Sequence, residues 1–181
     1  MASKIKVDQL ETADGSGTIA LQNQLSGMTT ASLPALGAAQ MPTGSVLQVV
    51  QTGSVSRTTV SSTGSWTSCM DLSITPSSTN SKILIMFVQG TRIVGSTPMR
   101  GGFRIERGST NIWNTDESRE QIQVRDASNE VDMMVTGQYL DSPNTTSSTT
   151  YTLQWNMLTG TTTYLWESGR GTNMTLMEIA G

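Results

Sequence analysis

Apolar and polar residues alternate with a period of two along most of this chain, which is the pattern of half-buried β-strands. The clearest run is YTLQWNML at 151–158, where Tyr, Leu, Trp and Met share one face and Thr, Gln and Asn share the other. Charged residues make up only 14% of the chain, whereas globular proteins usually contain ~25%. With many Thr and Ser residues and repeated Gly, the pattern predicts an all-β chain that is poor in helix.

From residue 44 onward, strand-like runs alternate with turn residues at the spacing typical of a β-sandwich. The predicted strands cover 45–52, 57–62, 65–76, 81–93, a hairpin within 101–113 that turns at Gly108-Ser109, 130–140, 151–158, 162–168 and 172–181. We expect 81–93, the most apolar run, to be a central strand buried on both faces. We expect 162–168 to pair with 151–158 across the Thr159-Gly160 turn, and the last run to be a paired interior strand. The predicted fold is an antiparallel jelly-roll-like β-sandwich.

Two further segments precede this head. Residues 3–25, SKIKVDQLETADGSGTIALQNQL, place two strand-like runs around the turn cluster ADGSG, which predicts a β-hairpin. A hairpin of this size cannot bury enough apolar surface to fold alone, so we expect it to dock on other chains. Its candidate anchoring side chains are the apolar residues Ile5, Val7, Leu10, Ile19 and Leu21. The predicted organisation is an anchor hairpin at 1–25, an extended connector at 26–43, and a head domain at 44–181.

The composition argues against catalysis and against bound cofactors. The chain has no His and a single Cys, Cys69, so the commonest general base, a disulfide and a cysteine-based zinc site are all missing. There is no G-x-S-x-G nucleophile motif. We therefore expect a protein that is not an enzyme, with no catalytic residue, no cofactor and no metal. The alternative that stays open is a glycosidase-like carboxylate pair, either Asp116 with Glu120 or Glu106 with Asp132.

Charge and hydropathy also limit the partners. The net charge is −3 and basic runs are absent, which argues against nucleic acid binding. No run of 18 apolar residues occurs, and the N-terminus lacks the apolar stretch of a signal peptide. We expect a protein that is made in a cytoplasm and does not insert into a membrane.

A charged segment at 114–132 holds the strongest candidates for recognition. Asp116, Glu117 and Glu120 could form a cation site or a receptor-reading loop, although their spacing matches no EF-hand, and a solvated loop or an inter-subunit salt-bridge belt is favoured. Trp113 lies beside this segment and is the best exposed aromatic candidate, whereas Trp155 and Trp166 are in phase with apolar neighbours and are expected in the core. The candidate receptor surface consists of Trp113, Asp116, Glu117, Arg119 and Asn144. Glu178 is expected to meet Arg104 or Arg170.

Three stretches together resemble a known family. SKIKVDQLETADGSGTIALQNQL resembles the openings of fibre and decoration proteins of tailed bacteriophages, particularly those of marine bacteria. TGSVLQVVQT, followed by SITPSSTNSKILIMF, resembles the first strands of the heads of these proteins, and TLMEIAG resembles their final strand. Such heads are similar to the trimeric jelly rolls of complement-type and tumour-necrosis-factor-like domains.

This resemblance implies a homotrimeric structural protein on the surface of a phage particle, made in the host cytoplasm. Residues 3–25 would bind another virion protein of the capsid or the tail. A chain of 181 residues is short for a tail fibre that reaches a receptor, which favours a capsid decoration or head-fibre protein. The alternative is a tail fibre or receptor-binding tip that recognises a host-surface glycan.

Overall fold

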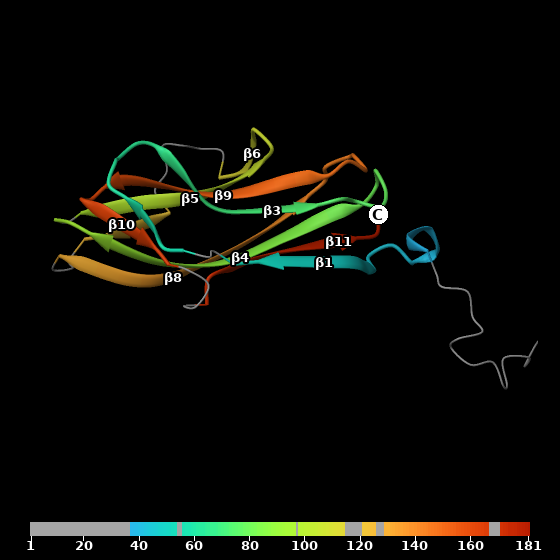
Figure 1. The fold of residues 1–181 in the computed structure, drawn as a ribbon, viewed down its shortest axis with the longest axis horizontal. Coiled ribbons are helices and arrows are strands. Elements are labelled where there is room, and N and C mark those ends of the chain that lie inside the picture. Colours follow the sequence, from blue (N-terminus) through green and yellow to red (C-terminus); the bar gives the residue numbers. More distant parts are fainter. Residues whose placement is uncertain (1–36, 54–55, 97, 115–120, 126–128, 167–170) are drawn as a thin grey trace, which may run out of the picture. The chain divides into compact units, whose positions relative to one another are not determined.

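The computed structural model describes residues 37–53, 56–96, 98–114, 121–125, 129–166 and 171–181. Gly37–Gly181 forms one compact unit. In its described residues this unit consists of two antiparallel sheets that pack face to face (Figure 1). The structure confirms the predicted all-β sandwich. No helix in these stretches has the length and apolar character needed to cross a membrane.

Sheet A contains six of the described strands. Along its main path the order is β1 (Val46–Thr52), β11 (Asn173–Ile179), β4 (Lys82–Val94), β10 (Thr162–Leu165) and β2 (Thr58–Val60), and β8 (Glu130–Asp141) also pairs with β4. β8 pairs with β4 from Ile83 to Val94, whereas β11 and β10 pair with successive parts of β4. β4 is therefore the central strand, and β11 lies between β1 and β4 as a paired interior strand, as predicted.

Sheet B contains the remaining five described strands. Its order is β3 (Trp66–Ile74), β9 (Thr149–Thr159), β5 (Met99–Arg107) and β6 (Thr110–Trp113), with β7 (Ile122–Val124) also paired with β5. The predicted hairpin at Gly108-Ser109 is confirmed as the connection between β5 and β6. β7 was not predicted from the sequence, because its three residues lie within a charged segment that shows no strand pattern.

The predicted pairing of residues 162–168 with 151–158 is wrong. β9 belongs to sheet B, whereas β10 pairs with β4 and β2 in sheet A. The turn between them carries the chain from one sheet to the other. Gly160 has φ 140°, a backbone conformation that favours glycine, and the next amide, Thr161 N–H, donates to Val94 O on β4 at 2.8 Å.

The prediction that residues 81–93 are buried on both faces is also wrong. The side chains of Ile83, Ile85 and Phe87 are buried between the sheets, whereas Leu84, Met86 and Val88 on the opposite face of β4 are only partly covered. The run is apolar on both faces, but only one face of it packs into the core of this chain.

The core lies between the sheets and is rich in aromatic contacts. Trp155 is fully buried, as predicted, with its ring centroid 4.7 Å from that of Phe103. The ring centroid of Phe103 on β5 lies 5.9 Å from that of Phe87 on β4, and this contact joins the two sheets. Cys69 packs against this core, and burial raises the pKa of its thiol above the usual value.

The described part of the predicted connector includes a short helical turn. Ala38–Gln40 form the single-turn 3₁₀ helix η2, and Gln40 N–H donates to Gly37 O at 3.0 Å. This part of the connector is therefore not fully extended. The predicted anchor residues Ile5, Val7, Leu10, Ile19 and Leu21 lie outside the described residues, so the predicted hairpin stays a prediction.

Candidate interaction surface

The outer face of sheet A carries a continuous row of apolar side chains across four strands. In the strand register Val49 on β1 lies opposite Met177 on β11, Met177 opposite Leu84 on β4, and Leu84 opposite Leu140 on β8. Directly paired residues share one face of a sheet and are in contact. We call these four residues the apolar row. Val49 and Leu140 are 53% and 49% exposed, so the ends of the row are open to solvent in a single chain.

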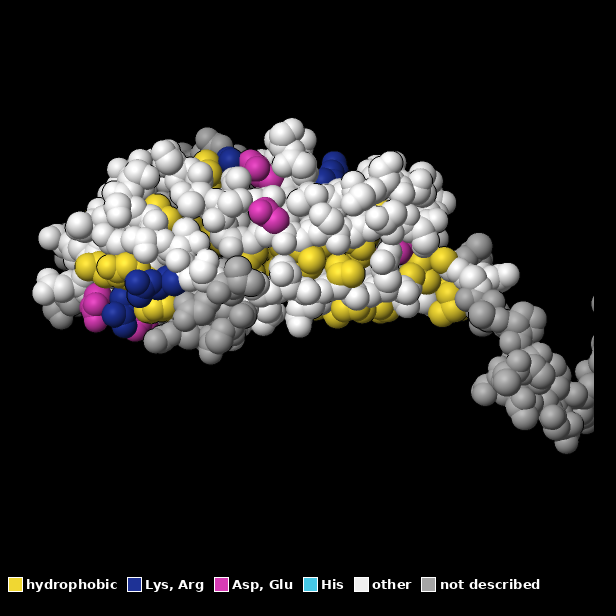
Figure 2. Space-filling model, viewed as in Figure 1, with side chains coloured by type: hydrophobic (Ala, Val, Ile, Leu, Met, Phe, Trp, Pro, Cys, Tyr) yellow, Lys and Arg dark blue, Asp and Glu magenta, His cyan; other side chains and the backbone are white. Residues whose placement is uncertain are grey.

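Other apolar side chains extend the row along the strands. Val46 lies opposite Ile179 on one side of it, and Val46 is 51% exposed. Met86 and Val88 continue it along β4 and are partly exposed. Figure 2 shows hydrophobic side chains gathered along the side of the sandwich formed by β1 and its neighbours.

The outer face of sheet B has the opposite character. In its register Ser68 on β3 lies opposite Gln154 on β9, and Gln154 lies opposite Arg104 on β5. Arg104 donates to Gln154 Oε1 at 2.7 Å and to Glu106 Oε1 at 2.6 Å, and its guanidinium lies 4.3 Å from the ring centroid of Trp66. This part of sheet B therefore presents polar side chains to solvent, whereas the region of sheet A around the apolar row presents apolar ones.

Toward the other end of β4 the outer face of sheet A changes to aromatic and charged groups. The rings of Tyr164 and Trp166 stack with centroids 6.4 Å apart. The Arg57 guanidinium lies 4.9 Å from the Tyr164 centroid, and that of Arg92 lies 5.4 Å from the Trp166 centroid. Such contacts attract a cation to the negative face of the ring. The predicted core position of Trp166 is wrong, because it is partly exposed on this outer face.

Arg92 joins this aromatic pair to two acidic residues on β8. Its Nη2 donates to Asp132 Oδ2 at 2.6 Å, and its Nη1 donates to Glu130 Oε2 at 3.4 Å. The hydrogen bond to Asp132 raises the pKa of the Arg92 guanidinium above its usual value. The group stays charged at every relevant pH, and the ends of β4 and β8 are tied together on this face.

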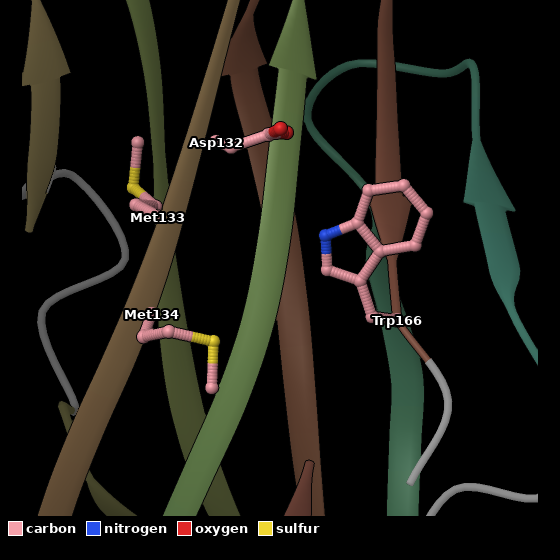
Figure 3. A pocket seen from close by; sticks show the side chains of 4 residues that line it. All are labelled: Asp132, Met133, Met134 and Trp166. Carbon is pink, nitrogen blue, oxygen red and sulfur yellow. The ribbon is translucent and has the colours of Figure 1, made fainter. Parts of the chain in front are cut away.

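A hollow lies beside Met134 and Trp166 (Figure 3). Its volume is about 340 Å³, and Asp132, Met133, Met134 and Trp166 line it. A Cβ atom at Gly90 would lie 2.7 Å from Trp166 Cδ1 and 3.3 Å from Met134 Sδ. The Trp166 ring and the Met134 thioether therefore pack directly over Gly90, which is buried and has no room for a side chain. We call the hollow beside them the Trp166 hollow.

Glu178 on the inner face of β11 is fully buried and holds three parts of the chain together. Its carboxylate accepts hydrogen bonds from the Ser77 N–H at 2.7 Å, the Ser77 and Ser81 hydroxyls at 2.6 Å each, and Gln48 Nε2 at 2.6 Å. Burial raises the pKa of Glu178, but these hydrogen bonds together lower it below its usual value. The expectation that Glu178 meets Arg104 is wrong, because Arg104 lies on the outer face of sheet B, and Arg170 lies outside the described residues.

The structure describes two of the five predicted receptor residues. Trp113 on β6 is partly buried, with its ring centroid 5.7 Å from that of Phe87, so much of its surface packs between the sheets. Asn144 is exposed in the loop after β8, with φ 53°. Asp116, Glu117 and Arg119 lie outside the described residues, as does Glu120. The receptor surface that they would form with Trp113 and Asn144 stays a prediction.

The second predicted carboxylate pair is not brought together. Glu106 lies on the outer face of sheet B beside Arg104, whereas Asp132 lies on the outer face of sheet A beside Arg92. Within the described stretches, no cluster of three or more His, Cys, Asp or Glu side chains could hold a metal ion.

Comparison with known proteins gives a distant structural likeness and no family. No protein family matches the chain, and no curated protein matches it. A solved structure of infectious bursal disease virus, Gx strain, is similar over 82% of this chain and 38% of its own, with 11% identity and a TM-score of 0.43. A structure of the Gt strain is similar over 82% of this chain and 42% of its own, with 12% identity and a TM-score of 0.40. The chain thus spans less than half the length of these proteins, and the likeness assigns it no function.

Proposed function

We propose that this chain is a structural protein of a bacteriophage particle, without enzymatic activity, whose head domain assembles as a homotrimer. Its N-terminal residues 1–25 would dock on another virion protein, and a capsid decoration or head-fibre role is favoured over a tail fibre. The resemblance of the three sequence stretches to phage fibre and decoration proteins supports the virion assignment. The protein would lie on the surface of the particle.

The apolar row on sheet A is the observation that supports the proposed homotrimer. Exposed contiguous apolar patches are uncommon on proteins that act as monomers, and they mark contact sites. The row runs across four strands and lies on only one of the two outer faces, so covering it requires a partner surface of similar breadth. A second and third copy of the same chain supply such a surface, because every copy carries the row.

The composition of the row supports a permanent contact between copies. Obligate interfaces between identical chains are more apolar than transient ones, and charged residues are depleted at their centres. Val49, Met177, Leu84 and Leu140 contain no polar side-chain group apart from a thioether. On the outer face of sheet A, the ion pairs of Arg92 with Asp132 and Glu130 lie farther along the strands.

The test is deletion of residues 1–25. We expect the shortened protein to remain a trimer by multi-angle light scattering, with about three times the mass of a single shortened chain, because the proposed contact lies in the head. We expect it to be missing from purified particles, whereas the full chain is incorporated. Incorporation of the shortened chain would contradict the docking role, and a monomeric head would contradict the assembly.

A further inference from the structure

We propose that the copies of the chain meet edge to edge around the trimer, with one side of sheet A packed against the opposite side of sheet A in the next copy. This arrangement rests on the proposed homotrimer and identifies the surfaces that form its contact. In the described part of sheet A, β1 and β2 lie at one side, which we call the β1–β2 edge, and β8 lies at the other, which we call the β8 edge. Unlike surfaces of identical chains that bind each other close into a ring when the rotation between copies permits it.

Both edges carry exposed apolar side chains on the outer face. Among the large hydrophobic side chains of the described residues, the exposed ones are Val46 and Val49 on β1 and Met134 and Leu140 on β8. Leu84 on the central strand β4, by contrast, is only partly exposed. The apolar surface that a single chain leaves open therefore concentrates at the two edges, where a neighbouring copy would cover it.

The two edges carry opposite charges in a second row of residues. Tyr164 on β10 pairs with Arg92 on β4, and Arg92 pairs with Asp132 on β8. Arg57, the residue before β2, extends this row, because its guanidinium lies 4.9 Å from the Tyr164 ring centroid. We call these four residues the charged row. It runs from a cation at the β1–β2 edge to a carboxylate at the β8 edge.

Both ends of the charged row can bind a further charged group. Arg57 is exposed, and none of the described carboxylates pairs with it. A guanidinium that stacks on a ring keeps its N–H groups in its own plane, where a carboxylate can accept them. At the β8 edge the side chains of Asp132 and Glu130 are 55% and 56% exposed and both pair with Arg92, so these three groups carry one more negative than positive charge. The charges of the two edges are therefore complementary.

The apolar row and the charged row lie far apart on the same face. They cross β4 at Leu84 and Arg92, which are eight residues apart in the sequence. A strand rises ~3.3 Å per residue, so this spacing corresponds to roughly 26 Å. Each row reaches both edges, and its two ends match each other. Both ends of the apolar row are apolar, and the ends of the charged row have opposite charges.

A rotation about an axis parallel to the strands keeps each row at its own level. It would bring Val49 of one copy beside Leu140 of the next, and Arg57 of one copy beside Asp132 of the next. A two-fold rotation perpendicular to the strands would reverse the levels and place the acidic end of the β8 edge against apolar side chains. Burial of a carboxylate without a partner is unfavourable, so the distribution of groups favours the parallel axis. Complementary charges also fix the register between copies.

The first experiment is cysteine cross-linking of the full chain. The combined variant Val49→Cys, Leu140→Cys is treated with a short bismaleimide, and we expect covalent dimers and trimers on denaturing gels. Within one chain the two positions are three strand spacings, or roughly 14 Å, apart, so a short reagent joins different chains. Each single variant should give little product, because like edges do not meet. The unchanged protein controls for Cys69, whose side chain packs against the core.

The second experiment measures dissociation of the trimer by sedimentation equilibrium. Arg57→Glu should raise the concentration of half-dissociation by about tenfold or more, because it places like charges side by side. In about 1 M salt, where charges are screened beyond about 3 Å, the effect should shrink to about threefold or less. Arg57→Glu should also have a smaller effect in the Asp132→Asn background, since the facing carboxylate is then neutral.

Arg125→Glu is the matched control, because Arg125 is also an exposed arginine but follows β7 of sheet B. Its trimer should dissociate within about twofold of the concentration found for the unchanged protein. If the cysteine variants do not fold, the dissociation measurements decide.

The outcomes separate the edge-to-edge contact from the proposed homotrimer. An unchanged protein that is monomeric or dimeric overturns both. A trimer in which the combined cysteine variant gives no linked chains, or in which a single variant cross-links equally well, overturns the edge-to-edge contact alone. Dissociation of Arg57→Glu at the same concentration as Arg125→Glu would have the same consequence.

Discussion

At the scale of single residues, Glu178 is a fully buried carboxylate that accepts four hydrogen bonds. A carboxylate that is buried without partners costs several kcal/mol, and Glu178 avoids this cost because four donors surround it. The donors come from β1 and from the loop between β3 and β4, whereas Glu178 itself lies on β11. One side chain therefore fastens three segments that are distant in sequence.

We expect Glu178→Gln to destabilise the fold by about 2–3 kcal/mol, because the amide is uncharged and its NH₂ group would face a donor. Urea denaturation of the full chain at neutral pH measures this loss. Glu130→Gln is the matched control, since Glu130 is exposed and lies in a surface ion pair with Arg92. Equal stability of the two variants would contradict the role assigned to Glu178.

The same residue predicts a pH dependence of stability. The pKa of Glu178 is lower in the folded chain than its usual value, so the folded state favours the charged form. This contribution is complete above the pKa of the unfolded chain, near 4.3, and is lost as the pH falls through the lower folded pKa. The fall in stability on acidification should be smaller in Glu178→Gln than in the unchanged protein.

Tryptophans show what a sequence can and cannot predict at this scale. The core position of Trp155 could be predicted because the residues two positions away, Leu153 and Met157, are apolar, whereas its direct neighbours, Gln154 and Asn156, are polar. The position of Trp166 could not be predicted in this way, because large side chains occur on both faces of this segment. Leu165 is buried, whereas Tyr164 and Trp166 lie on the outer face. Alternation shows that two faces differ, but only the packed sheet shows which of them is buried.

At the scale of elements, close contact between β5 and β9 limits which residues β5 can carry. A Cβ at Gly101 would clash with two ring atoms of Trp155 and would lie 2.8 Å from Asn156 O. We expect Gly101→Ala to destabilise the fold by about 1–3 kcal/mol, because the ring is held by the core and the carbonyl belongs to the backbone. Urea denaturation measures the change.

Gly108→Ala is the control for that substitution. Gly108 lies in the turn between β5 and β6 with φ 59°, and nothing lies within 4 Å of its virtual Cβ. Its replacement should cost about 1 kcal/mol through backbone conformation alone. A smaller loss at Gly101 than at Gly108 would show that β9 adapts to the added methyl group.

The strand positions were predictable, and the strand partners were only partly so. Period-two runs separated by turn residues located all strands of the head except β7 among those that the structure describes. Pairing depends on which sheet a strand joins, and that depends on contacts between distant residues. The chain passes from β9 to β10 through a short turn that resembles a hairpin in sequence, yet the two strands belong to different sheets.

At the scale of the whole molecule, the apolar row predicts that charged substitutions within it convert the proposed trimer into a monomer. Val49→Lys and Leu140→Lys change residues that are half-exposed in the single chain, so each should alter the stability of the fold itself by only about 0.5 kcal/mol. The combined variant should be monomeric by light scattering, because a lysine buried between copies would lose its hydration. Ser68→Lys on the outer face of sheet B is the control and should leave the mass unchanged. A combined variant with an unchanged mass would exclude the row from the contact.

The row itself could not be predicted from the sequence. Its four members come from four strands, and they become neighbours only through the register of β1, β11, β4 and β8. In the sequence of each strand, the member of the row is simply an apolar residue, and burial in the core is the simplest expectation for it. The Trp166 hollow has the same origin, since β8 and the residue that follows β10 supply its lining.

The position of β11 also determines when the molecule can fold during synthesis. Gln51 on β1 bonds to Thr175 on β11 at a sequence separation of 124 residues, so β1 can pair with β11 only after nearly all of the head has been synthesised. Pairings of such long range fold slowly and leave strand edges exposed in the meantime. A chain truncated by premature termination would lack the strand between β1 and β4, and its sheet A could not close. If copies of the chain assemble through sheet A, only chains that contain β11 could therefore take part.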